Sequence, residues 1–495
     1  MAFSSVQFLF VFLPLSLAVY WLCPKWLRNA VLAAFSLLFF AWAGLKGAAI
    51  LVLLAGINWL GGLSLGRLAH KRPLLILLIL LDLAVLGGFK YAGFAAETVN
   101  ALVPGLLPVL SPALPLGLSF YVFTAIGYCA DVAAGKVESE KNPIRFAVFL
   151  AFFGHGPSGP IVRYGQQAPQ LDPGSETRRV SADRFCYGIK RLVLGLAKKA
   201  IIADQLALIY AKAASVPAAT LPAPILVLGY TAYMMQLYFD FSGYSDMAIG
   251  IGEFFGITLP ENFEYPYLAC SIGEYWRRWH ISLSSWFRDY LYFPLGGSRG
   301  SSGRTAVNLM ITFLVSGLWH GAGWHYVVWG AIHGSYQVAG RGIRYVSEAA
   351  QKKLPEKKIR FFSEKTQGLT RATRICVTFI LTDFAWLFFR ADHLGRAVAM
   401  LRRIVQNGNW LGQFTDGTLF GMGLCRLEVY QLAFAIGVLL VVDILHESGI
   451  SIRAWLAKQV LVIRWSIYML VLLGFVVLLL QNYGRAAAEF LYFQF

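Results

Sequence analysis

The chain of 495 residues is 57% hydrophobic and only 14% charged, which excludes a soluble fold and predicts an all-α polytopic membrane protein. Its net charge of +17 does not indicate nucleic-acid binding, because the aromatic residues that could stack on bases lie within apolar runs. The six cysteines show no Cys-x-x-Cys spacing, so neither a disulfide framework nor a thiolate metal site is expected.

The first apolar stretch, residues 1–21, has no leading positive charge and no cleavage site, and is predicted to be an uncleaved membrane span. Basic residues follow at Lys25 and Arg28 and again at 67–72, and the positive-inside rule places both groups in the cytoplasm. About eleven transmembrane helices are expected in total. Further spans are predicted at residues 30–43, 48–65, 73–92, 115–132, 221–239, 244–255, 375–389, 430–445 and 463–480.

Three segments do not fit a simple span. Residues 146–153 are apolar but too few to cross a bilayer, and the glycines and prolines after them predict a re-entrant or interfacial element lining a cavity. The basic stretch 178–199 is either a cytoplasmic loop leading into a helix or a surface for an anionic acyl donor such as a phosphopantetheine carrier. Residues 341–374 contain ten basic residues and are predicted to be a cytoplasmic loop.

Residues 274–292 are too charged to cross a membrane, yet their apolar side chains recur at about 100° per residue. This pattern predicts one amphipathic helix with tryptophans and His280 on its apolar face. Loss of hydration there favours a neutral imidazole that can accept a proton. Upstream, Asp240 and Asp246 lie on unrelated helix faces, which favours structural hydrogen bonding over paired acid–base chemistry.

A second histidine, His320, ends an apolar run that Gly321 and Gly323 interrupt. Counted from Arg304, it lies roughly 24 Å along a helix, well within a hydrocarbon core about 30 Å thick. Ionisable groups at such depth are costly, so a functional role is expected, although a packed core histidine is the alternative for either residue taken alone. His325 lies on a different face from His320, which does not indicate a zinc site.

The chain resembles the membrane-bound O-acyltransferase family in two motifs, Trp279-His280-Ile281-Ser282-Leu283-Ser284 with Arg288-Asp289-Tyr290-Leu291, and Ser316-Gly317-Leu318-Trp319-His320-Gly321. Similar pieces occur at residues 159–164, 239–248, 261–263 and 490–495, so the likeness covers nearly the whole chain. The resemblance implies a single integral membrane domain over residues 1–495, with re-entrant and interfacial helices around a central tunnel. It also implies an essential intramembrane histidine at His320 and a second polar site residue at His280.

The activity implied is an O-acyltransferase of the bacterial inner membrane. It would move an acetyl group from a cytoplasmic thioester toward a hydroxyl of an exopolysaccharide such as alginate. The acyl donor, acetyl-CoA or an acyl carrier, is a co-substrate, so no cofactor is expected. The partners implied are periplasmic polysaccharide acetyltransferases, a cytoplasmic acyl carrier, membrane lipid and the exopolysaccharide acceptor.

His320 is expected to be the general base, with an acyl-histidine as an open alternative, and His280 to orient the acyl group or His320. Gly317, one turn before His320, is expected to face the tunnel. The tunnel is expected to be lined by Trp276, Trp279, Trp286, Asn308, Ser316 and Trp319. Two other functions remain open: D-alanyl transfer to teichoic acid, and translocation of a polysaccharide or lipid without chemistry.

Overall fold

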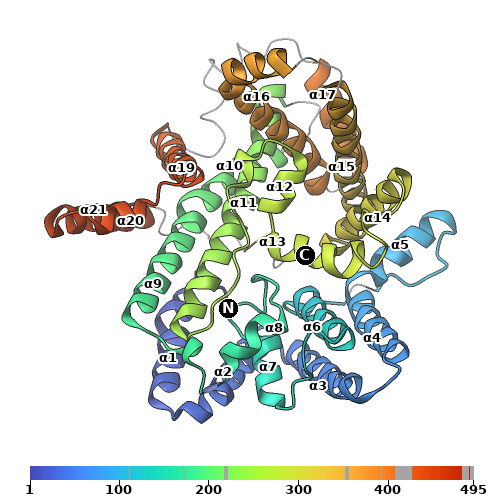
Figure 1. The fold of residues 1–495 in the computed structure, drawn as a ribbon, viewed down its shortest axis with the longest axis vertical. Coiled ribbons are helices and arrows are strands. Elements are labelled where there is room, and N and C mark those ends of the chain that lie inside the picture. The colour runs from blue at the N-terminus through green and yellow to red at the C-terminus, as the bar shows by residue number, and fades with distance from the viewer. Residues whose placement is uncertain are drawn as a thin grey trace.

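The computed structural model describes residues 1–110, 112–172, 174–216, 221–351, 356–391, 393–406, 426–481 and 490. Within these residues all regular secondary structure is helical, which confirms the predicted all-α fold. Figure 1 shows the short helices α12 (Ile272–Arg278) and α13 (Ile281–Phe287) near the middle of the bundle, with longer helices around them.

In the N-terminal part of the chain, α1, α2, α3, α4 and α6 lie close to the predicted spans, and several short helices that were not predicted lie between and after them. These elements are η1 (Phe8–Phe12), α1 (Leu13–Leu22), η2 (Lys25–Leu27), α2 (Arg28–Ala43), α3 (Leu45–Arg67), α4 (Arg72–Lys90), α5 (Ala92–Leu102), α6 (Leu118–Ala133), α7 (Pro143–Ala151), α8 (Tyr164–Gln167), η3 (Ala168–Leu171) and η4 (Glu176–Arg178).

The C-terminal part contains the longest helices and the central short ones. Besides α12 and α13, its elements are α9 (Ala182–Ala197), η5 (Lys198–Ala203), α10 (Asp204–Ala214), α11 (Ala223–Phe254), η6 (Pro266–Leu268), η7 (Arg288–Tyr292), α14 (Ser302–His320), α15 (Trp324–Gln351), α16 (Glu356–Arg390), α17 (Leu394–Gln406), α19 (Arg426–Glu447), α20 (Ile452–Ala457) and α21 (Leu461–Gln481).

Six segments of the described chain are long and apolar enough to cross a membrane, as judged by length and composition. Helices α1 and α6 are shorter apolar helices of the same character. The expected total of about eleven transmembrane helices stays a prediction. The six segments are 25–43, 45–67, 72–90, 370–390, 426–447 and 461–478.

Helix α11 corrects the prediction of two separate spans at 221–239 and 244–255, because it runs unbroken over 32 residues. Its carboxylates form ion pairs with the preceding basic segment: Asp240 with Lys199 at 2.7 Å, and Asp246 with Lys198 at 2.7 Å and Arg191 at 2.6 Å. The aspartates are therefore structural, as the sequence predicted. The ion pairs compensate the charges of Asp240 and Asp246, and most of the apolar residues around them on α11 are buried. The helix therefore continues through these two aspartates.

The basic stretch 178–199 was predicted to be either a cytoplasmic loop leading into a helix or a surface for an anionic acyl donor, and the helix is present. Most of it is helix α9, which packs along α11 through glycines on both helices. A Cβ atom on Gly195 would overlap the carbonyl oxygen of Gly243, and one on Gly250 would overlap that of Gly188. This close approach brings Arg184, Arg191, Lys198 and Lys199 to carboxylates of α11. A surface for an anionic acyl donor on this stretch stays a prediction.

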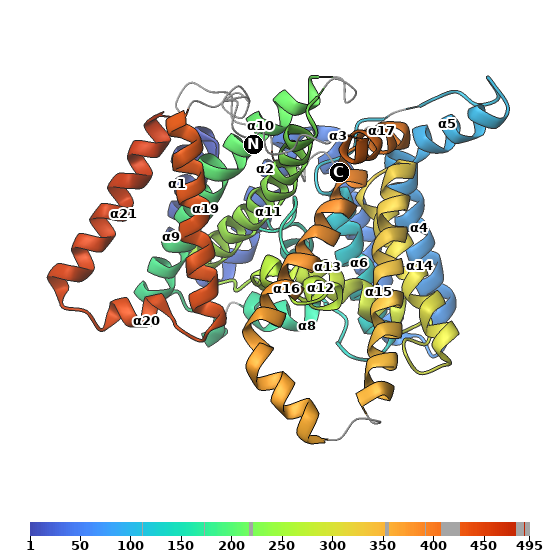
Figure 2. The same cartoon turned by 90° about the horizontal axis from the view of Figure 1, so that it is seen from above.

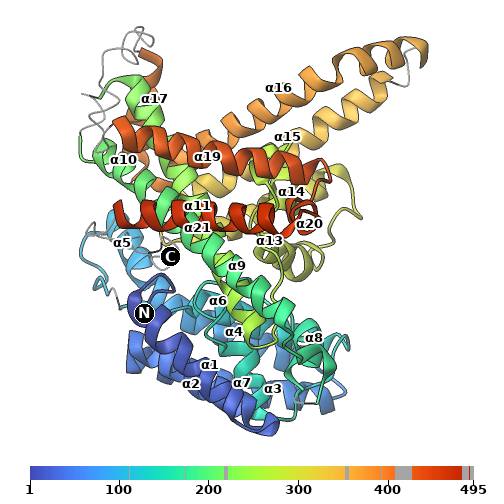
Figure 3. The ribbon, with the colours of Figure 1, turned by 90° about the vertical axis from the view of Figure 1, so that its left-hand side faces the viewer.

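Residues 341–374 are also helical where the structure describes them, because α15 continues to Gln351 and α16 begins at Glu356. Figures 2 and 3 show these two helices extending together beyond the rest of the bundle. The segment is rich in glutamate, lysine, arginine and alanine, which are good helix formers, so its charge indicates a solvated helix as readily as a loop. Residues 352–355 lie outside the described part.

The short element predicted at residues 146–153 is present as helix α7, while its re-entrant or interfacial placement stays a prediction. Helix α7 is nine residues long and is capped by Asn142, whose side chain accepts from the backbone N–H groups of Ile144 and Arg145. The chain then continues as a buried, non-helical turn over residues 152–162. His155 and Gly159 of this turn pack against α6 with no space for a water molecule between them, so the expected cavity-lining role stays a prediction. Of the terminal motif 490–495, only Phe490 lies within the described residues.

Candidate active site

His280 occupies a break between two short helices. The sequence predicted one amphipathic helix over residues 274–292, but α12 ends at Arg278 and α13 begins at Ile281. His280 has φ 45° and ψ 53°, a left-handed conformation that is uncommon for residues other than glycine. Such strain persists only where the surrounding structure imposes it, and it gathers at functional sites.

The surrounding structure here is an extended segment after α11. Phe263 pairs with Trp279 in an isolated antiparallel bridge. The backbone N–H of Ile281 donates to the carbonyl of Asn262 at 2.9 Å. These contacts come from a distant part of the chain and replace the bonds that a continuous helix would make through His280. Local periodicity could not reveal them.

The side chain of Asn262 sets the tautomer of His280. Its Oδ1 accepts from the backbone N–H of Ser282 at 3.2 Å, so this atom must be the oxygen of the amide. The Nδ1 atom of His280 lies 3.2 Å from the same oxygen and therefore carries a proton. In the neutral imidazole, Nε2 then has the lone pair. Asn262 is held in turn by Ser245 of α11, whose hydroxyl oxygen accepts from Nδ2 at 3.2 Å.

His320 is the last residue of α14 and is only 1% exposed. The rings of Trp319, Trp329 and Phe389 stand nearly perpendicular to its imidazole, with centroids 5.0, 5.1 and 5.4 Å away. The imidazole of His280 lies at 6.5 Å. Residues from α14, α15, α16 and the α12–α13 break thus bring the two predicted histidines together in an aromatic enclosure.

The end of α14 is clamped by α4, a feature that sequence reasoning missed. Lys90 Nζ donates to the carbonyl of Trp319 at 2.5 Å, and the hydroxyl of Tyr91 donates to the carbonyl of Leu318 at 2.5 Å. The last carbonyls of a helix have no partner within the helix, and a cation near them also interacts favourably with the negative end of the helix dipole. A lysine at the end of a mainly apolar span was the signal that could have indicated this contact.

Three of the six predicted tunnel residues lie at or beside the histidine pair. Trp319 lies beside both, with its ring centroid 6.1 Å from that of His280 and 5.0 Å from that of His320. Trp279 precedes His280 and is fully buried. Ser316 is buried one turn before His320, on the same side of α14. The indole nitrogens of Trp319 and Trp279 are buried and have no hydrogen-bond partner among the described residues.

The other three, Trp276, Trp286 and Asn308, hold elements together. Asn308 precedes His320 by twelve residues, about 18 Å along α14, so it does not reach the pair. Each donates one hydrogen bond to a neighbouring element: Trp276 to Nδ1 of His333 at 3.2 Å, Trp286 to the Phe123 carbonyl at 2.8 Å, and Asn308 to the Gly297 carbonyl at 3.0 Å. A tunnel past His320 stays a prediction.

Gly317 does not face open space, contrary to the expectation that it borders the tunnel. A Cβ atom there would overlap the carbonyl oxygen of Tyr326 on α15. The reciprocal residue is Gly330, where a Cβ atom would overlap the carbonyl of Phe313. Paired glycines let α14 and α15 pack backbone to backbone, and this contact supports the helix end that carries His320.

The chain is similar in sequence to known proteins. A model of the membrane-bound O-acyltransferase family matches residues 118–356. The chain is 37% identical to a probable alginate O-acetylase from Pseudomonas putida over 514 aligned positions, which cover both proteins completely. It is 39% identical to a probable alginate O-acetylase from Azotobacter vinelandii, with 88% of this chain and 82% of the relative covered. It is also 32% identical to a peptidoglycan O-acetyltransferase from Helicobacter pylori, with 86% and 81% covered.

The chain belongs to the membrane-bound O-acyltransferase family. It is accordingly an O-acyltransferase and a multi-pass membrane protein, as the sequence predicted. The region matched by the family model includes both histidines and Asn262, whereas Lys90 precedes it. The clamp on α14 is therefore contributed from outside the matched region of this O-acyltransferase.

Proposed function

We propose that this O-acyltransferase moves an acetyl group from a cytoplasmic thioester, through the bacterial inner membrane, toward a hydroxyl of an exopolysaccharide such as alginate. The observation that carries the proposal is the pairing of His280 and His320 at 6.5 Å between aromatic rings. The choice of acetyl and of a polysaccharide is supported by the relatives, two of which are named probable alginate O-acetylases and match over most of their length.

In this proposal His320 is the general base. Its imidazole takes the proton of the attacking hydroxyl, whose oxygen then bonds to the thioester carbonyl carbon. When the tetrahedral intermediate collapses, the carbon–sulfur bond breaks and the imidazolium returns the proton to the departing thiolate. His280, oriented by Asn262, is proposed to position the acyl group or His320. An acyl-histidine at His320 is the covalent alternative, in which the imidazole nitrogen attacks first.

Developing negative charge on the acyl oxygen needs hydrogen-bond donors already in place. The indole N–H groups of Trp319 and Trp329 suit this role, because both rings contact His320 and both nitrogens are buried with no partner among the described residues. The same rings would exclude water, which could otherwise hydrolyse the thioester.

The partners in this proposal are periplasmic polysaccharide acetyltransferases that complete the transfer, and a cytoplasmic acyl carrier or acetyl-CoA as donor. The general-base step requires no metal or organic cofactor of its own. Membrane lipid surrounds the apolar helices, of which α21 is the most exposed candidate span.

The proposal is tested with isotopically labelled acetyl-CoA given to inverted membrane vesicles, following the label onto protein and polymer. We expect His320→Ala and His320→Gln to reduce transfer by about 10² to 10⁴, the usual cost of losing a general base. The control is His70→Gln, which changes an exposed histidine. Transfer above a tenth of wild type in either His320 variant would exclude His320 as the base.

The same vesicles separate the other two functions. Transfer of labelled D-alanine in place of acetyl would identify a D-alanyltransferase. If no label reached protein or polymer while polymer export depended on the chain, a translocator without chemistry would be the correct interpretation. In that case His320→Gln should be tolerated, because it largely preserves shape and hydrogen bonding.

A further inference from the structure

A polar cavity of about 380 Å³ lies where α1 ends and α2 begins. Residues 174–180, which include η4, form its other wall. Its charged lining consists of four basic residues and one acidic residue: Lys25, Arg28, Arg178, Arg179 and Glu176. The cavity therefore has a net positive lining, which favours an anionic ligand.

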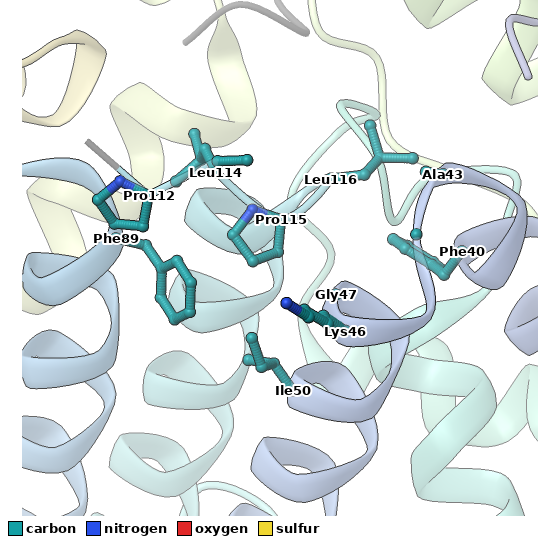
Figure 4. A pocket seen from close by; sticks show the side chains of 12 residues that line it. Phe40, Ala43, Lys46, Gly47, Ile50, Phe89, Pro112, Leu114, Pro115 and Leu116 are labelled. Carbon is teal, nitrogen blue, oxygen red and sulfur yellow. The ribbon is translucent and has the colours of Figure 1, made fainter. Parts of the chain in front are cut away.

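A second cavity has a mainly apolar lining, so a positively charged lining is not a general property of cavities in this fold. This one, of about 480 Å³, lies between α2, α3, the end of α4 and the segment 112–116 (Figure 4). Apolar side chains such as Phe40, Ile50 and Phe89 line it, and Lys46 is its only charged lining residue. Of these two cavities, the one beside α1 combines several cations with a polar wall.

Arg178 is the central residue of the polar cavity and is only 3% exposed. Its Nε donates to the hydroxyl of Tyr20 at 3.1 Å, and its Nη1 donates to Oδ1 of Asn29 at 2.5 Å. Its Nη2 is buried with no hydrogen-bond partner, and no carboxylate of the described residues pairs with this guanidinium. A buried cation with a vacant donor is costly unless an anion compensates it.

Arg28 provides a second guanidinium with a vacant donor. It lies over the ring of Tyr20, 5.0 Å from the centroid, and Arg178 lies 5.7 Å from the same centroid. The Nε atom of Arg28 is buried and has no hydrogen-bond partner among the described residues. Two guanidinium groups are thus held beside one tyrosine, and guanidinium is the side-chain group best suited to binding phosphate oxygens.

The cavity walls are already held in position by contacts of their own. The Tyr20 hydroxyl donates to the carbonyl of Phe255, at the end of α11, at 2.7 Å. Asn29 Nδ2 donates to the carbonyl of Leu171 at 2.8 Å, which ties the start of α2 to η3. A ligand would therefore not have to order these side chains, and that preorganisation favours binding.

The place of the cavity in the membrane points to the source of the anion. Trp21, Leu22 and Trp26 beside it are 47%, 86% and 72% exposed. Exposed tryptophans at the end of an apolar helix are typical of the membrane–water interface. The neighbouring basic residues predict the cytoplasmic side, where the leaflet carries anionic lipids.

We propose that this cavity binds the phosphate group of an anionic phospholipid from the cytoplasmic leaflet, held by Arg178 and Arg28. The phosphate oxygens would accept from the vacant Nη2 of Arg178 and Nε of Arg28, while Lys25 and Arg179 balance the charge at the cavity mouth. The inference does not depend on the proposed acyl transfer, because it concerns binding alone.

The test is native mass spectrometry of the full-length protein in non-ionic detergent with dioleoyl phosphatidylglycerol. Arg28→Gln with Arg179→Gln should weaken binding of the first lipid about tenfold, the effect of losing a charge-assisted hydrogen bond. Arg178 is left unchanged in this variant because it also holds the 174–180 segment. The matched control is Arg67→Gln with Arg72→Gln, which removes two exposed charges on the same predicted side of the membrane.

Dioleoyl phosphatidylcholine should bind more weakly than phosphatidylglycerol to the wild type, because its choline would face the basic lining. A further variant, Arg28→Lys with Arg179→Lys, keeps the charge and loses the planar groups, so intermediate affinity is expected. Equal lipid binding by the glutamine variant and its control would overturn the proposal. Displacement of the lipid by micromolar inorganic phosphate would overturn the lipid source and support a site for soluble phosphate.

Discussion

The hydrogen bond from Lys90 to the last turn of α14 leads to the sharpest prediction, because Lys90 affects the position of His320 without contacting substrate. In Lys90→Met the side chain keeps its length and loses its donor. The Trp319 carbonyl then loses its partner at 2.5 Å, and Ser119 loses a weaker one at 3.3 Å. Since α14 ends at the very next residue, the orientation of its last peptide group directly sets the position of the His320 side chain.

The expected magnitude follows from two opposing effects on stability. A buried carbonyl left without a donor lowers the free energy of unfolding by about 1–3 kcal/mol. Removing a charge from an apolar setting raises it by a similar amount. The net change in stability is therefore expected to be small. Catalysis has no such compensation, because a displacement of about 1 Å at a catalytic group can lower the rate on the order of 10²-fold.

The assay measures kcat and KM for the acyl donor together with the thermal unfolding midpoint. Lys90→Met should lower kcat about 10- to 100-fold with KM near wild type, since Lys90 positions His320 and does not bind donor. Tyr91→Phe should have a smaller effect, because it removes one neutral hydrogen bond. Lys46→Met, at an exposed lysine on α3, is the matched control. Unchanged kcat in Lys90→Met would refute the positioning role.

Three further predictions concern the site, the helix packing and the topology. His280→Asn should retain more activity than His280→Ala, because an amide keeps a donor toward Asn262; equal activities would mean that His280 only fills space. Gly317→Ala should lower the unfolding midpoint, because its Cβ meets the α15 backbone, while Gly303→Ala in open space on the same helix should not; equal midpoints would contradict the packing account. A cysteine at Ser363, in a variant without exposed native cysteines, should resist an impermeant reagent in intact cells and react after permeabilisation; labelling in intact cells would reverse the topology.

Composition and short motifs were enough to predict the fold class and the family. Apolar runs of span length require helices, because a backbone in lipid must satisfy its own hydrogen bonds. That constraint acts locally, so α2, α3, α4 and α7 begin and end near the predicted residues. The end of the helix at His320 also followed from a local pattern, the glycines after it, and the structure does end α14 at that residue.

Errors arose where contacts between distant segments decide the local structure. The segment 274–292 has helical periodicity throughout, yet backbone pairing with residues 262 and 263 turns His280 into a left-handed break. In α11 the opposite occurred: two spans were predicted, but one helix continues through Asp240 and Asp246, which are paired with lysines and an arginine from α9 and η5. Neither outcome can be read from a single stretch, since each depends on a partner many residues away.

The sequence by itself determined that this is a helical membrane protein with two chemically distinctive histidines, because hydropathy and residue type are local properties. Only the tertiary structure decided that these histidines lie 6.5 Å apart, that Asn262 sets the tautomer of one, and that Lys90 clamps the helix that carries the other. Those relations join α4, the segment after α11, the α12–α13 break and α14. Their geometry depends on how the whole bundle packs, and packing is a property of surfaces in contact that no single stretch of the chain contains.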